Sequence, residues 1–151
     1  MSVSLYGYLK FFHILFVALF VGAFTAMALL WTRGRLAPDP ERRYAYVDAV
    51  VFISQRLSTI AGSILLLAGI LMLVYQPAIL GTGILFHIKM ALGILVVGAS
   101  HLAHVKAKRL RRALSEERVD TKAERFMELA TWIVPALAFV VLFLGIMISH
   151  G

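Results

Sequence analysis

The chain has no cysteine and few acidic residues. Without cysteine, disulfide bonds, thiolate metal sites and cysteine nucleophiles are excluded, so any metal must be held by histidine, methionine, lysine, a carboxylate or a cofactor. The 8 acidic residues stand against 15 basic ones, giving a formal charge of +7. In a soluble chain this excess would suggest nucleic acid. Here the basic residues cluster between apolar runs, which indicates membrane lipid as the partner and no nucleic acid.

Apolar residues make up 61% of the 151 positions, and the mean hydropathy is +0.88. Both values lie above those of ordinary soluble domains. Four apolar stretches reach the ~20 residues needed to cross a ~30 Å hydrocarbon core, namely residues 5–31, 50–75, 84–105 and 126–148. Because backbone groups in lipid must pair internally, we expect one all-α domain over residues 1–151, a bundle of four transmembrane helices.

Local signals indicate where the helices begin. Asp39 followed by Pro40 is typical of a helix start, so the second helix is expected to begin before its apolar stretch. Thr82 can cap the third helix, and Thr121 with Glu124 forms a capping box before the fourth.

The distribution of basic residues predicts the orientation. Of the 15 Lys and Arg residues, 4 lie in segment 32–47 and 8 in segment 106–125, while segment 76–83 has none. By the positive-inside rule both basic segments are cytoplasmic and both termini lie outside, as in a multi-pass protein of the inner (plasma) membrane. A signal peptide is the competing interpretation of the start, but the first apolar run is longer than such peptides carry.

Ionisable residues inside the apolar stretches are functional candidates, because a charge in mid-membrane costs ~3 kcal/mol or more. Judged by depth, they form two layers. The outer layer consists of Lys10, His13, His87 and Lys89, and the inner layer of Arg56, His101, His104 and Glu128.

His13 and His87 are the candidate metal ligands. At ~1.5 Å per residue their depths differ by about one helical turn, so the two imidazoles are expected to face each other across the bundle. Such pairs hold haem iron between helices. Lys10 and Lys89 either snorkel to the outer surface or serve the site. His87 and Lys89 are about 200° apart on one helix, so only one of them can face a central iron.

The charged residues of the inner layer are expected to pair with one another and to bind no second cofactor. His101 follows His87 by about 21 Å on a similar helix face, as in stacked haems, but no histidine on another helix lies at its level. We therefore expect one haem b, on the outer side. Arg56 and Glu128 are expected to pair as a buried ion bridge with His101 beside them.

Several other residues are assigned to surfaces. Trp31, Tyr75 and Trp132 fit the aromatic belt at the membrane interface. His104 borders a basic segment and His150 is the penultimate residue, so both are expected to be solvated.

Three short motifs and one histidine carry a family resemblance. They are Tyr-Leu-Lys-Phe-Phe-His at 8–13, Gln-Arg-Leu at 55–57, Phe-His-Ile-Lys at 86–89 and His101. With these motifs in a four-helix frame, the chain resembles the HemJ family of membrane protoporphyrinogen IX oxidases and, more loosely, the CopD-like membrane proteins. The fourth helix departs from the family's Asn-Glu-x-Pro signature, having only Met127-Glu128, and Phe86 replaces the usual tryptophan.

The resemblance implies a haem b held by His13 with either His87 or Lys89, and oxidation of protoporphyrinogen IX to protoporphyrin IX in haem biosynthesis. The residues themselves allow a haem that takes electrons from a flat apolar reductant and passes them to a quinone-like acceptor. In that scheme Lys89 or Lys10 handles protons or carboxylates, and Arg56 with Glu128 stabilises charge.

Three alternatives stay open. One is a haem-b electron-transfer protein with no substrate of its own. Another is a CopD-like copper or metal transporter using His13, His87 and methionines. The third is a structural membrane partner. Small residues such as Gly22 and Gly62 also permit a homo-oligomer.

Overall fold

The computed structural model describes residues 5–81 and 83–150, apart from the side chains at 146 and 148–150, and every regular element in this part of the chain is helical. The elements are α1 (Leu5–Arg35), α2 (Pro40–Ile53), the π-helical turn η1 (Ser54–Ser58), α3 (Thr59–Tyr75), the 3-10 turn η2 (Pro77–Gly81), α4 (Ile84–Ser115) and α5 (Thr121–His150). The all-α prediction is confirmed. Four helical segments are long and apolar enough to cross a membrane, with α2, η1 and α3 counted as one.

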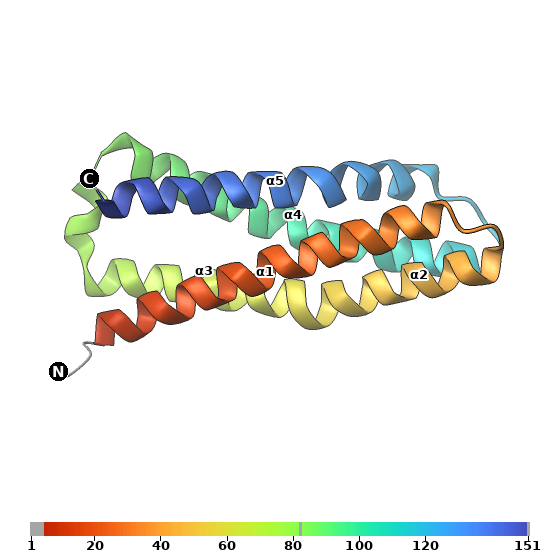
Figure 1. Cartoon of the computed structure of the whole chain (residues 1–151), viewed down its shortest axis with the longest axis horizontal. Helices are drawn as coiled ribbons and strands as arrows, with labels where there is room; N and C mark the ends of the chain where they lie inside the picture. The colour runs from red at the N-terminus through yellow and green to blue at the C-terminus, as the bar shows by residue number, and fades with distance from the viewer. Residues whose placement is uncertain (1–4, 82, 151) are drawn as a thin grey trace.

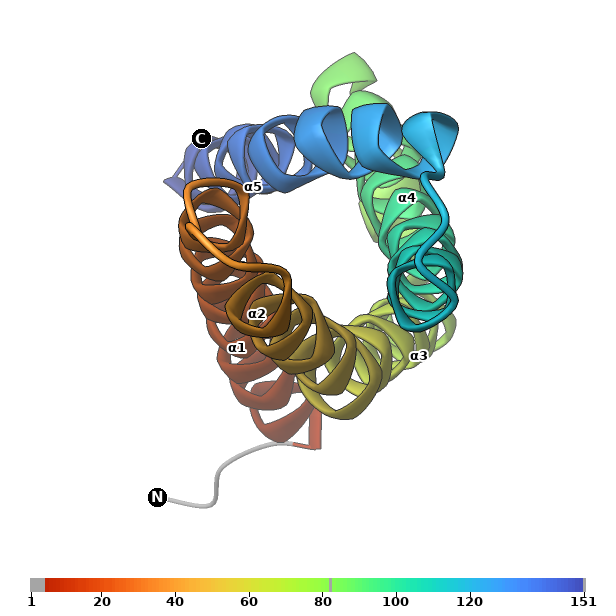
Figure 2. The ribbon, with the colours of Figure 1, turned by 90° about the vertical axis from the view of Figure 1, so that its right-hand side faces the viewer.

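The helices run up and down along one long axis (Figure 1). The start of α1, η2 and the end of α5 lie at one end, which we call the terminal end. The α1–α2 turn and the α4–α5 connection lie at the other, which we call the basic end. Viewed along the axis, the helices form a ring (Figure 2). Helix α1 contacts α2, α3 and α5, and α4 contacts the same three helices from the opposite side.

The helices extend past the predicted spans. Helix α4 continues to Ser115, through residues 106–115 that were expected to belong to a charged loop. The reason is an apolar stripe that outlasts the apolar run: Ala103, Ala107 and Leu110 are all buried at helical spacing. The α4–α5 connection is therefore only the short segment 116–120.

The helix caps confirm one prediction and correct another. Asp39 Oδ1 accepts a hydrogen bond from the Arg42 backbone N–H at 2.7 Å, with Pro40 as the first helical residue. In α5 the cap is Asp120, whose Oδ1 accepts from the Ala123 N–H at 2.9 Å. Thr121 therefore lies inside the helix and the expected capping box is wrong.

Two expectations fall on parts of the chain that are not described. Thr82 and the side chain of His150 lie outside the described residues. Helix α4 has Gly83 as its N-cap, with a φ of 111° that favours glycine.

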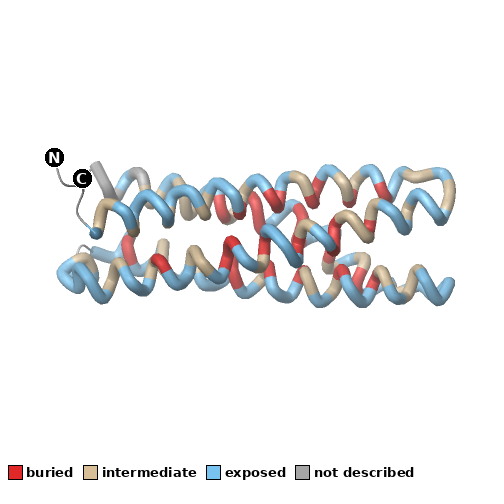
Figure 3. Tube along the Cα trace, turned by 90° about the horizontal axis from the view of Figure 1, so that it is seen from below, coloured by how far each residue is buried: buried red, intermediate tan, exposed pale blue. Residues whose placement is uncertain are grey.

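The apolar core occupies the middle and the basic half of the bundle (Figure 3). Its largest fully buried side chains include Phe20, Phe24, Met27 and Met127. No described residue of α1 before Phe20 is buried. The terminal end is therefore the less tightly packed part of the molecule.

The three aromatic residues that were assigned to the membrane interface differ in their exposure. Tyr75 and Trp132 are 55% and 59% exposed, as a membrane belt requires. Trp31 is only 4% exposed and belongs to the core, so its assignment to the belt is wrong. A single tryptophan near a helix end does not reveal which face it occupies; here Trp31 belongs to the same buried cluster as Val47 of α2 and Met127 of α5.

Candidate functional site

His13 is a half-buried side chain of α1 that faces α3. A Cβ built at Gly69 would lie 3.6 Å from His13 Cε1 and 3.9 Å from Nδ1, so the glycine leaves room for the ring. The backbone of Leu65 is also near the imidazole. Within the described part of the chain, its Nδ1 atom is nevertheless buried without a hydrogen-bond partner. Such an unsatisfied polar atom is unusual in a folded protein and marks this ring for attention.

Lys89 reaches toward the same region from α4. Its half-buried side chain crosses to α5, where a Cβ built at Gly145 would lie 3.1 Å from Nζ. Lys89 is within electrostatic range of both His13 and Lys10. All 8 acidic residues of the sequence fall in segments 39–48 and 116–128, close to the basic end. The three basic side chains therefore form a cluster, called here the terminal cluster, without an acidic side chain from the same part of the sequence.

His87 does not face His13. Its side chain is exposed, and its Nδ1 lies 3.1 Å from the Gly83 carbonyl of the chain just before its own helix. The inward face of α4 at this level carries Phe86, which is 7% exposed. Successive helical residues point about 100° apart, so with Phe86 and Lys89 turned inward His87 must point out. The expected opposition of His13 and His87 is wrong in this geometry.

The expected ion bridge between Arg56 and Glu128 is also wrong. Glu128 forms its ion pair with Arg35 of α1. Arg56 is an exposed residue of η1, and η1 makes no contact with α5 among the described residues. His101 lies apart from both: it is exposed, and its Nδ1 donates to the Val97 carbonyl of its own helix at 2.9 Å.

A polar layer that the sequence did not reveal lies where η1 meets α4. Ser54 and Ser58 are completely buried, and Ser54 Oγ is hydrogen-bonded to His104 Nδ1 at 2.8 Å. His104 is therefore half-buried and partnered, which corrects its expected solvation. Ser58 Oγ is buried with no hydrogen-bond partner among the described residues. The π-helical turn explains this layer, because its extra residue brings serines into the interior.

The cluster does not form a conventional metal centre. Within residues 5–81 and 83–150, no three His, Asp or Glu side chains come together in a way that would hold a metal ion. Comparison of the chain with protein-family models, curated proteins and solved structures finds no match. The functional argument therefore rests on the residues and their geometry.

Proposed function

We propose that the chain is a four-span membrane protein that binds one haem b at the terminal end and oxidises protoporphyrinogen IX to protoporphyrin IX. The observation that carries the proposal is His13, whose ring lies against Gly69 and whose Nδ1 is buried without a partner among the described residues. An imidazole on the inner face of a helix bundle is a common ligand of haem iron. The motif resemblance to the HemJ family supports the same choice of residue.

The residues that would hold the haem at the terminal end are His13 and Lys89. Both are half-buried, come from different helices and are seated against glycines. His87 does not fit, because it points away from the bundle. The exposed apolar surface of α1 before Phe20 is also suited to a flat apolar group. A bound haem supplies a one-electron redox centre.

The lysines of the terminal cluster suit an anionic porphyrin substrate. Lys89 and Lys10 have no acidic side chain from their own part of the sequence to neutralise them, so they are available to attract carboxylates or to exchange protons. A quinone-like acceptor in the lipid phase would take up the electrons that the porphyrinogen loses. Arg56 lies 13 positions from Gly69, about 20 Å along the helix, so the proposal gives neither Arg56 nor Glu128 a part in the reaction.

The test of the proposed function is spectroscopic and then catalytic. Protein purified in detergent from cells well supplied with haem is expected to show a b-type α band after reduction with dithionite. It is also expected to convert protoporphyrinogen IX to the fluorescent porphyrin faster than a haem-free control. A colourless protein contradicts haem binding. A normal α band without turnover identifies an electron carrier instead.

Gly69 offers a graded test of the space beside His13. In Gly69→Ala the new methyl carbon lies 3.6 Å from His13 Cε1, an ordinary contact, so haem content is expected to stay at the wild-type level. In Gly69→Leu the larger side chain must occupy the position of the ring, and haem content is expected to fall by about tenfold. The measurement is haem per polypeptide; equal content in the two variants contradicts the placement of His13.

We further propose that the basic end faces the cytoplasm and that both termini lie outside. The fold brings segments 32–47 and 106–125 to the same end (Figure 1), and these hold 12 of the 15 Lys and Arg residues. Positive charge gathered at one end is the pattern of the positive-inside rule. The same rule leaves η2 and the terminal cluster on the outer side.

The absence of cysteine makes this orientation directly measurable. Ala78→Cys places a thiol on η2, and Val119→Cys places one in the α4–α5 connection; both positions are exposed. A membrane-impermeant maleimide is expected to label Ala78→Cys in intact cells and Val119→Cys only after permeabilisation. The reverse pattern contradicts the orientation.

A further inference from the structure

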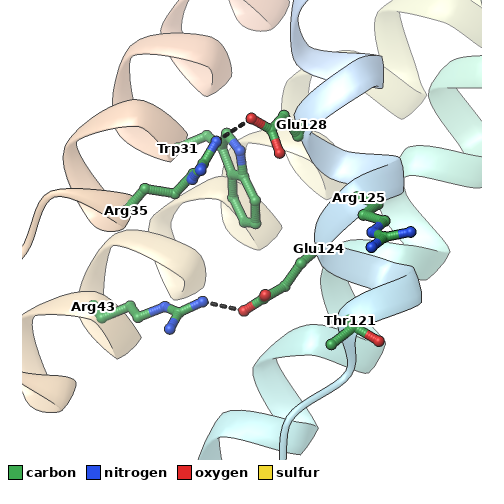
Figure 4. A pocket seen from close by; sticks show the side chains of 7 residues that line it. All are labelled: Trp31, Arg35, Arg43, Thr121, Glu124, Arg125 and Glu128. Atoms are coloured by element: carbon green, nitrogen blue, oxygen red, sulfur yellow. Dashed lines mark hydrogen bonds and ion pairs between the residues drawn. The ribbon is translucent and has the colours of Figure 1, made fainter.

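Helices α1 and α5 lie close together at the basic end of the bundle. There Arg35 of α1 forms an ion pair with Glu128 of α5, beside the buried indole of Trp31 (Figure 4). Toward the terminal end the two helices diverge, and α1 crosses to lie along α3 (Figure 1 and Figure 2). His13 of α1 accordingly lies against Gly69 of α3. We call the line between residues 10–35 of α1 and 128–145 of α5 the α1–α5 seam.

Burial falls along the side of α1 that carries Trp31. Lys10, Val17, Phe24 and Trp31 are spaced seven residues apart, so each lies within about 20° of the next around the helix. Trp31 and Phe24 are 4% and 0% exposed, Val17 is half-buried and Lys10 is exposed. This side of α1 is therefore packed in the basic half of the seam and uncovered at the terminal end.

The matching side of α5 loses its cover in the same direction. Phe139 follows Glu128 by 11 positions, about three turns, so both side chains leave α5 on the same side. Phe139 is exposed, and Ala138 is the last buried residue of α5 among the side chains that the structure describes. Each helix thus presents uncovered apolar surface to the lipid at the terminal end of the seam.

Positive charge lies at this uncovered end. Lys10 and Arg35 are 25 positions apart, about seven turns, so Lys10 leaves α1 on the side that faces α5 at Arg35. Lys89 reaches α5 from α4, with its Nζ 3.1 Å from a Cβ built at Gly145. The two lysines are within electrostatic range of each other. All 8 acidic residues belong to segments close to the basic end, so an anion at this end of the seam meets a positive field.

We propose that the porphyrin substrate enters laterally from the lipid phase through the terminal end of the α1–α5 seam, with Lys10 at the mouth and Lys89 further in. The inference rests on the proposed function, and it adds the route and the residue that first binds the substrate. The flat apolar ring suits exposed side chains such as Ile14 and Phe139. Its carboxylates suit the two ammonium groups.

The first test measures the binding of protoporphyrin IX, by its fluorescence, to detergent-purified protein with empty micelles subtracted. Lys10→Gln is expected to raise the apparent Kd about tenfold, because one ammonium–carboxylate contact is lost. Lys108→Gln removes the same charge from an exposed residue near the basic end, and it is expected to leave the Kd unchanged. The dimethyl ester of protoporphyrin IX carries no carboxylate, so it is expected to bind wild type and Lys10→Gln equally. Equal weakening by the two lysine variants overturns the role of Lys10.

The second test blocks the seam with a bulky label. Because the chain has no cysteine, Val17→Cys and Leu19→Cys each carry a single thiol. Position 17 lies on the side of α1 that holds Lys10, and position 19 is exposed about 200° around the helix. N-phenylmaleimide is expected to weaken porphyrin binding about tenfold at position 17, by filling the seam, and to leave it unchanged at position 19. Equal binding after labelling at both positions overturns lateral entry. Displacement of the porphyrin by an equal concentration of phosphatidylglycerol also overturns it, since the seam then holds a lipid headgroup.

The outcomes differ from those of a failed haem proposal. Porphyrin binding that responds to Lys10→Gln and to the label at position 17, in a protein without a b-type α band, supports lateral entry and contradicts haem binding. A normal α band with porphyrin binding that responds to neither change overturns lateral entry and leaves the haem site standing.

Discussion

The His13→Ala protein is expected to lose the reduced b-type α band and to contain at least about tenfold less haem than the wild type. The substitution removes the imidazole of His13, whose Nδ1 is buried without a hydrogen-bond partner among the described residues. Nothing in the described part of α1 replaces it, since α1 has no second histidine. The measurement is the dithionite-reduced spectrum of detergent-purified protein, with haem quantified against polypeptide.

His87→Ala is the matched control, because it removes the same side chain at a similar depth from a residue that points outward. Its spectrum is expected to equal that of the wild type. Lys89→Leu tests the second ligand: the side chain stays apolar and loses its amine, so the position of the α band is expected to shift. Loss of haem in His87→Ala with retention in His13→Ala would contradict the site.

The sequence predicted the helices well because their signal is physical and local. About 20 apolar residues in a row leave helix formation as the way to satisfy the backbone in lipid. The ends were less predictable. Residues 106–115 are rich in charge, and only the spacing of Ala107 and Leu110 on the apolar stripe showed that α4 would continue. The prediction from charge density alone therefore began the loop between the third and fourth spans too early in the sequence.

The sequence predicted how far along its helix each candidate residue lies, but it did not predict which way each side chain points. The depths of His13 and Lys89 follow from counting residues, and the structure brings both to the terminal end. Which of His87 and Lys89 faces inward depends on the rotation of α4, which the packing of Phe86 sets. The partner of Glu128 depends on which helices are neighbours: α5 lies beside α1 and not beside η1, so Arg35 pairs with it and Arg56 does not.

Gly62 is a position where we expect a large effect on stability from the smallest change. A Cβ there would lie 3.0 Å from Phe20 Cε2 and 3.5 Å from Val97 Cγ1, where α1, α3 and α4 meet. Phe20 is 1% exposed and packs against Phe24 with ring centroids 5.1 Å apart, so it has little room to withdraw. Gly62→Ala is expected to cost about 1–3 kcal/mol of folding free energy.

Gly22→Ala is the control that isolates this packing cost. Gly22 lies inside α1 with nothing within 4 Å of a built Cβ, so both variants remove one flexible glycine from a helix. That change alone stabilises a helix by up to about 1 kcal/mol. Gly22→Ala is therefore expected to match or exceed wild-type stability, while Gly62→Ala falls below it. Each is measured as the temperature at which half of the detergent-solubilised protein stays monodisperse on size-exclusion chromatography. Equal midpoints for the two variants would mean that α1, α3 and α4 do not meet at Gly62 as closely as the structure has them.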